Sequence, residues 1–144
     1  MKSEDTIDYF LKVVWQSVAN TYNQIATGFG ITQAIGYALI NIHEEGTAVS
    51  QIASLMGVKS TSLSRMLNNM EELGLIFREA DPDDKRSVKI FLTETGKAKR
   101  KQAKDVVRKF NEYLNSQISE DDRKQLIETL NKVNQLALMY KPEQ

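Results

Sequence analysis

Residues 49–73 place two short apolar-periodic segments on either side of one glycine, Gly57. Apolar residues recur every three or four positions, the period of a helix that buries one face. Glycine at the junction permits the positive φ that ends a helix in a sharp turn, and the small Ala53 lets the two helices approach closely. The pattern predicts a helix-turn-helix. Its expected inward-facing side chains are Ile52, Leu55, Met56, Val58, Leu63, Met66, Leu67, Met70 and Leu73.

The second helix of this motif carries hydrogen-bonding side chains away from its apolar stripe. Short hydroxyl and amide groups suit phosphates and base edges, and the arginine suits bidentate pairing with guanine. The candidate DNA-contacting residues here are Lys59, Thr61, Ser62, Ser64, Arg65, Asn68 and Asn69. The same residues also suit an ordinary solvated helix face, with the hydroxyls capping their own helix. This stretch alone leaves both interpretations open.

A two-stranded hairpin is predicted directly after the helix-turn-helix. Gly74 ends the second helix, and residues 75–79 and 88–92 have the composition and alternation of strands. The segment 81–87 between them is dense in turn-forming residues. A hairpin in this place is a wing. Together with a helix at 33–44, capped by Thr32, it predicts a winged-helix DNA-binding lobe over residues 31–93.

Three further helices are predicted outside the lobe, over residues 4–27, 94–116 and 120–140, each with an apolar stripe. Such helices are not stable alone, so their stripes must pack on each other or on a second copy. We expect a homodimer with twofold symmetry, built from residues 4–27 and 94–140. A monomer with an appended helical bundle is the alternative. The predicted fold is mainly α with a small β-hairpin wing, in a single domain 1–144.

The net charge is zero, but the charges are unevenly distributed. Residues 59–104 carry eleven basic and seven acidic side chains, whereas residues 1–58 carry two and five. The positive surplus therefore gathers around the second helix of the helix-turn-helix, the wing and the helix that follows the wing, as contact with a duplex requires. The surplus is modest, so the charge distribution supports the prediction without deciding it.

Three segments are the most specific part of the pattern: Leu73-Gly74-Leu75-Ile76, Asp81-Pro82-Asp83-Asp84-Lys85-Arg86-Ser87 and Leu92-Thr93-Glu94-Thr95-Gly96. Together with the order of elements, they resemble the MarR family of bacterial transcription regulators. The resemblance covers nearly the whole chain. It implies a dimer that binds a pseudo-palindromic double-stranded DNA operator. The second helix of the helix-turn-helix would lie in the major groove and a wing arginine in the minor groove. It also implies a repressor that a small aromatic effector releases from DNA.

The resemblance assigns roles residue by residue. Thr61, Ser62, Ser64 and Arg65 match the start of the family's recognition helix. Arg86 matches the wing arginine, with Lys85 beside it, and Asp84 matches the aspartate that orients that arginine. Two departures matter. Ser60 stands where the family commonly has proline, which weakens helix initiation, and Asp83 stands where many members carry a wing arginine. The wing aspartates are expected to hold the turn or to brace Arg86 and Arg78.

Four aromatic residues are candidates for an effector pocket between the dimerisation helices and the lobe: Trp15, Tyr22, Phe29 and Tyr37. Aromatic residues at helical spacing are more often core, so that interpretation stays open. His43 stands in no metal-ligand spacing, and Gly28-Phe29-Gly30 follows no strand that would make it a dinucleotide loop. No nucleophile–base pair is visible. We therefore expect no catalytic residue, no metal, no cofactor and no enzymatic activity.

The remaining features bear on location and on the competing function. No apolar run is long enough to span a bilayer, the start of the chain lacks a secretory signal, and there is no cysteine. We expect a cytoplasmic protein without a membrane partner. The alternative function is a winged-helix module for protein–protein interaction with incidental DNA binding, which the zero net charge and the acidic wing favour.

Overall fold

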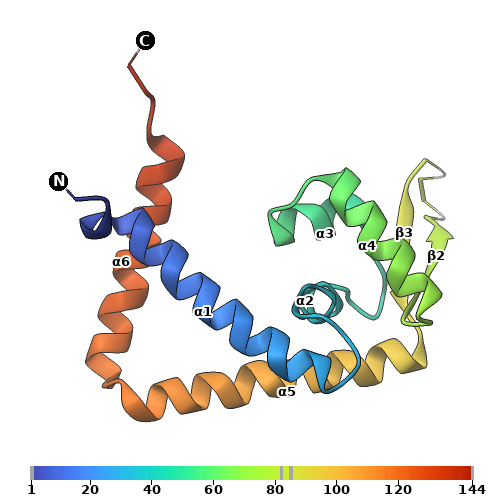
Figure 1. Cartoon of the computed structure of the whole chain (residues 1–144). Coiled ribbons are helices and arrows are strands. Elements are labelled where there is room, and N and C mark those ends of the chain that lie inside the picture. Colours follow the sequence, from blue (N-terminus) through green and yellow to red (C-terminus); the bar gives the residue numbers. More distant parts are fainter. Residues whose placement is uncertain (1, 82, 85, 144) are drawn as a thin grey trace. The chain divides into compact units, whose positions relative to one another are not determined.

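The computed structural model describes residues 2–81, 83–84 and 86–143. By internal contacts the chain divides into two compact units, residues 1–106 and 107–144. In chain order the elements are η1 (Ser3–Asp5), α1 (Ile7–Thr27), α2 (Gln33–Ile40), β1 (Thr47–Ala48), α3 (Val49–Met56), α4 (Ser60–Glu72), β2 (Ile76–Ala80), β3 (Val88–Leu92), α5 (Glu94–Gln117) and α6 (Glu120–Met139) (Figure 1). No helix among the described residues is both long and apolar enough to cross a membrane.

Hydroxyl side chains mark where several helices begin. The side chain of Thr6 accepts a hydrogen bond from the Tyr9 backbone at the start of α1, and Thr32 accepts one from Ile35 at the start of α2. Thr93 and Ser119 cap α5 and α6 in the same way. These hydroxyls satisfy N–H groups that have no partner within the helix. The predicted cap at Thr32 is confirmed.

Glycine closes both helices of the helix-turn-helix. Gly57 has a φ of 67° after α3, and Gly74 has a φ of 75° after α4. Both angles lie in the left-handed region that glycine adopts without steric cost. The predicted helix-turn-helix is thus present as α3 and α4. Helix α2 ends four residues earlier than predicted, where Asn41 stands as the C-cap and its side chain donates to the carbonyl of Tyr37.

The wing contains a third strand that the sequence did not predict. Strand β1 pairs antiparallel with β3, so the sheet order is β1-β3-β2, with Thr47 opposite Ile90. Thr47 is buried, and its hydroxyl accepts a hydrogen bond of 2.9 Å from the His43 backbone. A strand of two residues has no alternation to detect. It anchors the wing to the segment between α2 and α3.

The core of the first unit lies within the predicted lobe. Its buried apolar residues are Ile31, Ile35, Ala38, Leu39, Ile42, Ile52, Ala53, Leu63, Leu67, Met70, Leu75, Ile76, Ile90 and Leu92. They come from α2, α3, α4, the sheet and the segments next to these elements, including Ile31 just before α2. Helix α1 contributes no buried residue to this core.

Three side chains expected in the core are exposed, so those predictions are wrong: Leu55 is 48%, Val58 38% and Leu73 50% exposed. Leu55 lies about 110° around α3 from the middle of the buried face formed by Ile52 and Ala53. Val58 lies in the turn between the two helices. Leu73 is the C-cap of α4, where the backbone leaves the helix.

Candidate nucleic-acid interface

Helix α4 is fixed in the lobe by one buried face. Leu63, Leu67 and Met70 are fully buried there. At 100° per residue, Thr61, Arg65 and Asn68 lie on the opposite side of the helix. All seven residues predicted here to contact DNA are exposed: Lys59, Thr61, Ser62, Ser64, Arg65, Asn68 and Asn69. The structure therefore brings the predicted polar residues to the exposed surface of one helix.

The N-terminal end of α4 forms an open hollow. Thr61, Ser62 and Arg65 line it, and its volume is about 280 Å³. The N-cap residue, Lys59, makes no side-chain capping hydrogen bond. The first N–H groups of a helix lack intrahelical partners and attract anions such as phosphate. This end of α4 therefore combines backbone donors, hydroxyl groups and two cations at the surface.

Two of the predicted contact residues, Ser64 and Asn68, also form hydrogen bonds within the protein. The hydroxyl of Ser64 donates to the carbonyl of Ser60 over 2.9 Å, within α4 itself. The side-chain oxygen of Asn68 accepts a hydrogen bond of 2.7 Å from Nη2 of Arg78 on β2. Nε of the same arginine lies 4.0 Å from a carboxylate oxygen of Glu71. Helix α4 and the wing are thus joined through Arg78.

The Arg78 contact corrects one sequence expectation. Arg78 was expected to be braced by the wing aspartates, whereas its partners are Asn68 and Glu71 of α4. The three residues are separated by a glycine turn and the start of a strand. No local spacing rule links positions across such a break, so this contact could not be predicted from the sequence.

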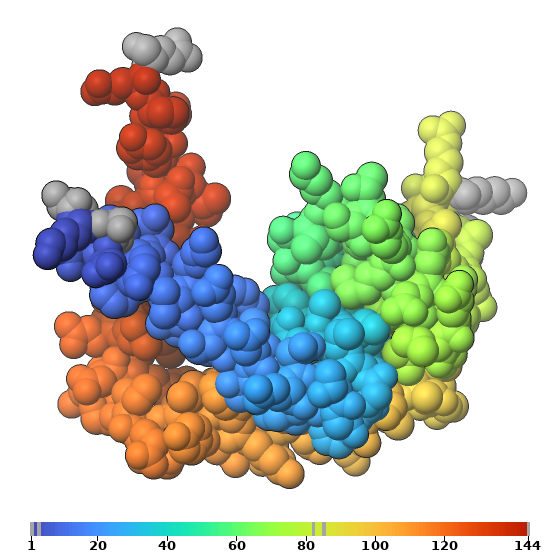
Figure 2. All heavy atoms as spheres, in the orientation of Figure 1, coloured from blue at the N-terminus to red at the C-terminus, as the bar shows by residue number. Residues whose placement is uncertain are grey.

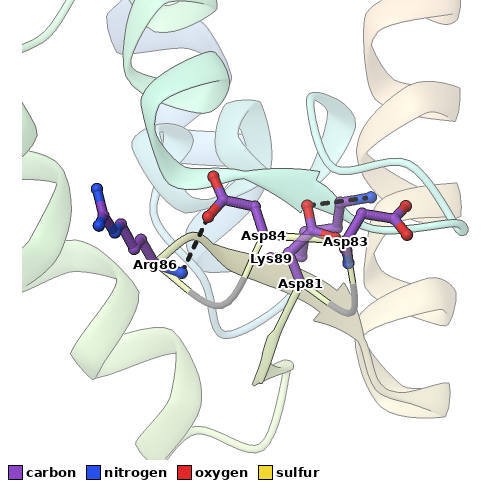
Figure 3. Close-up of polar contacts among 5 residues, drawn as sticks. All are labelled: Asp81, Asp83, Asp84, Arg86 and Lys89. Atoms are coloured by element: carbon purple, nitrogen blue, oxygen red, sulfur yellow. Dashed lines mark hydrogen bonds and ion pairs between the residues drawn. The ribbon is translucent and has the colours of Figure 1, made fainter.

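The wing turn is shaped by two aspartates (Figure 3). Asp81 accepts a hydrogen bond of 2.9 Å from the Asp83 backbone, and its other oxygen lies 3.9 Å from Nζ of Lys89. Asp84 accepts one of 3.1 Å from the backbone N–H of Arg86. Such side-chain-to-backbone bonds two residues on are typical of Asx turns. The expected internal role therefore holds for Asp81 and Asp84.

Arg86 lies at the tip of the wing. Its side chain is exposed and extends away from Asp81, Asp83 and Asp84 in Figure 3. Asp84 contacts the backbone of Arg86, so it sets the direction of that residue through the turn. Lys85, the other predicted wing contact, lies outside the described residues. In Figure 2 the wing stands out beyond the surface formed by α3 and α4, which leaves its tip accessible to a large partner.

The four candidate pocket residues lie at or near the surface of the first unit. Trp15, Phe29 and Tyr37 are exposed, and Tyr22 is half-buried. Their role as an effector pocket stays a prediction. Among the described residues, no three His, Cys, Asp or Glu side chains form a group suited to a metal ion.

Comparison with known proteins gives one family. A model of the MarR family matches residues 29–87. The organic hydroperoxide resistance transcriptional regulator of Bacillus subtilis (strain 168) is 31% identical over 107 residues, which are 74% of this chain and 73% of that protein.

Solved structures of MarR-type regulators share the fold. The S. aureus MepR–DNA complex superposes with a TM-score of 0.83 at 25% identity, over 94% of this chain and 99% of that one. A MarR variant from E. coli complexed with operator DNA gives 0.80 at 25% identity, over 88% and 92%. The structural match confirms the predicted winged helix, and the resemblance read from the sequence is confirmed as well. The chain belongs to the MarR family of transcription regulators.

Proposed function

We propose that this chain regulates transcription by binding an operator in double-stranded DNA as a homodimer. The observation that carries the proposal is the two-sided character of α4. One side is fully buried through Leu63, Leu67 and Met70, while the opposite side presents Thr61 and Arg65 at the surface. The DNA complexes of the MepR and MarR structures support the same use of this fold.

Each copy places α4 in the major groove. Arg65, with a planar fork of donors, pairs with O6 and N7 of guanine and supplies base preference. Thr61, Ser62, Lys59 and the free N–H groups at the start of α4 bind phosphate oxygens and fix the register of the helix. The remaining polar residues of the helix, Ser64, Asn68 and Asn69, complete this surface.

The wing occupies the adjacent minor groove. Arg86 is the residue that enters it, because its side chain extends from the tip and away from the aspartates. Lys85, beside it in the sequence, adds a phosphate contact. Asp84 supports this geometry because its carboxylate accepts a hydrogen bond of 3.1 Å from the backbone N–H of Arg86.

The homodimer forms through residues 4–27 and 94–140, outside the lobe of residues 31–93. Helix α1 supports this division because large apolar side chains along it are exposed in the single chain, including Ile7, Phe10, Val14 and Trp15. Burial of such surface is worth roughly 25 cal/mol per Å². Two copies related by a twofold axis then meet two half-sites about 34 Å apart, or one helical turn.

The regulator acts as a repressor that a small aromatic effector releases. Trp15, Tyr22, Phe29 and Tyr37 would contact the effector, which would favour a dimer whose two α4 helices no longer match the operator spacing. The protein works in the cytoplasm, where a bacterial operator is found. Adding candidate aromatic acids to the protein–operator complex tests this part: they should raise the dissociation constant, and variants of Trp15 or Tyr22 should not respond.

The salt dependence of DNA binding separates this proposal from a protein-interaction module. A regulator that neutralises several phosphates loses affinity steeply as salt rises, with a slope of about −0.9 per phosphate in a log–log plot. We expect a steep slope on a duplex that carries the operator. A flat response would favour the alternative, in which the winged helix serves a protein partner and DNA contact is incidental.

A further inference from the structure

The contact between Arg78 and Asn68 orients a side chain on the proposed DNA-reading surface. Nη2 of Arg78 donates to Oδ1 of Asn68 over 2.7 Å, and Nε lies 4.0 Å from Oε2 of Glu71. Asn68 and Glu71 are three positions apart on α4, so they are neighbours on one side of the helix. The guanidinium group contacts both residues, and the Arg78 side chain is 35% exposed.

The chemistry of arginine decides which end of the Asn68 carboxamide faces β2. Arginine carries only donors, whereas an asparagine amide has an accepting oxygen at one end and two N–H donors at the other. A reversed amide would set N–H groups against N–H groups. The oxygen must therefore face Arg78, and the Nδ2 amino group points away from it. Asn68 is otherwise an exposed side chain of α4.

The positively charged guanidinium group of Arg78 also changes which groups the Asn68 amide can bind. A hydrogen bond from a guanidinium to the oxygen polarises the amide and strengthens its N–H groups as donors. The positive charge at the oxygen disfavours the approach of a second donor. Bidentate reading of adenine requires such a second donor at the Asn68 oxygen. In that arrangement the amide oxygen accepts from the adenine N6 amino group while the amide nitrogen donates to N7.

We propose that Arg78 fixes Asn68 as a hydrogen-bond donor toward DNA, so that Asn68 contacts an acceptor atom and does not read adenine. The acceptor is guanine O6, a purine N7, thymine O4 or a phosphate oxygen, and a contact to N7 alone gives adenine no advantage over guanine. The proposal rests on α4 being the DNA-reading helix. Arg78 itself touches no base in this account and is a positioning residue.

The test compares base preferences of wild type, Asn68→Ala, Asn68→Asp, Arg78→Met and Arg78→Lys by competition among duplexes that differ at single base pairs of the selected half-site. If Asn68 reads a base, Asn68→Ala relaxes preference at one position by about fivefold, since one contact is worth about 1 kcal/mol. If it binds phosphate, all duplexes weaken alike, and Asn68→Asp, which has no donor, weakens them further.

The Arg78 variants test the orienting role. Arg78→Met frees the amide to turn: adenine then gains at the position that Asn68 reads, or, for a phosphate contact, affinity falls uniformly as in Asn68→Ala. Arg78→Lys keeps a donor and a charge at the same place and restores the wild-type pattern. Because preference is a ratio, the loss of one cation in Arg78→Met cancels from the base-reading result.

Different results overturn different statements. Adenine preferred by the wild type at the position that Asn68 reads would contradict the inference. So would wild-type preference and affinity in both Asn68→Ala and Arg78→Met. A wild type that selects no sequence at all would remove the proposed function, and this inference with it. Thermal unfolding of each variant checks that the exposed substitutions leave the lobe folded.

Discussion

The hydroxyl of Thr93 donates a hydrogen bond to the carbonyl oxygen of Gly74, 2.6 Å away. The same hydroxyl oxygen accepts from the backbone N–H of Gly96 over 3.0 Å as the N-cap of α5. The backbone N–H of Thr93 donates to the carbonyl of Leu75 over 3.0 Å. One threonine thus joins the turn after α4 to the start of α5. It holds the C-terminal end of the proposed DNA-reading helix in place.

Replacing Thr93 by valine keeps the shape of the side chain and removes its hydroxyl. We expect the free energy of unfolding to fall by about 1–2 kcal/mol, because a helix cap and a second hydrogen bond are both lost. Urea denaturation at a fixed protein concentration measures the change. Thr93→Ser is the matched control and should lose less than half as much. Equal losses in the two variants would show that the hydroxyl is not the cause.

Gly96 and Gly36 are both helical glycines, and their surroundings predict opposite effects of a methyl group. A Cβ on Gly96 would collide with the carbonyl oxygen of Leu75, whereas one on Gly36 would meet only side-chain atoms, at 3.7 Å. We expect Gly96→Ala to lower the free energy of unfolding by more than about 2 kcal/mol. Gly36→Ala should leave it unchanged or raise it by up to about 1 kcal/mol. Thermal unfolding distinguishes them, and a similar small change in both would contradict the close packing at Gly96.

Leu67 lies in the middle of α4 and Leu73 is its C-cap. Only Leu67 is buried, with 1% of its surface exposed against 50% for Leu73. Leu67→Ala should cost about 2–5 kcal/mol of stability, as expected for a cavity in a packed core. Leu73→Ala should cost less than about 1 kcal/mol. Urea unfolding of the pair measures both. A large loss from Leu73→Ala would show that its side chain is covered in the protein as it exists in solution.

The starts and ends of several helices are determined by residues close to them in the sequence. Helix starts at Thr32, Thr93 and Ser119 were predictable because a cap acts within three residues. The ends at Gly57 and Gly74 were predictable because glycine relieves a local strain. The exposure of Leu55, Val58 and Leu73 was not predictable, since periodicity alone does not say where a helix ends relative to the core.

The contacts that could not be predicted from the sequence join segments that are distant along the chain. Strand β1 exists because Thr47 and Ala48 pair with residues of β3 more than forty positions away. The hydrogen bond from Arg78 to Asn68 and the one from Thr93 to Gly74 likewise connect separate elements. At the candidate site, the residue types and their exposed face on α4 were predictable. The commitment of the Asn68 oxygen to Arg78 was not.

Asp83 and Asp84 differ in what their carboxylates do for the wing. Asp84 accepts from the backbone of Arg86, whereas the Asp83 carboxylate points away from Arg86 in Figure 3. Asp83→Asn should therefore tighten DNA binding by about two- to fivefold at low salt, through lost repulsion of phosphate, with the gain shrinking as salt rises. Asp84→Ala removes the same charge together with the turn contact, and it should not show this gain. Fluorescence anisotropy with one duplex measures both, and equal gains would exclude a role for the Asp84 contact.

Selection of bound duplexes from random DNA tests the central claim most directly, when wild type and Arg65→Ala are compared. We predict that the wild type enriches a pseudo-palindrome whose half-site centres lie about 10 base pairs apart. Arg65→Ala should lose the preference for a guanine in each half-site, by about 1–3 kcal/mol. No enriched sequence with the wild type, or the same sequence enriched equally by Arg65→Ala, would contradict the reading of DNA by this face of α4.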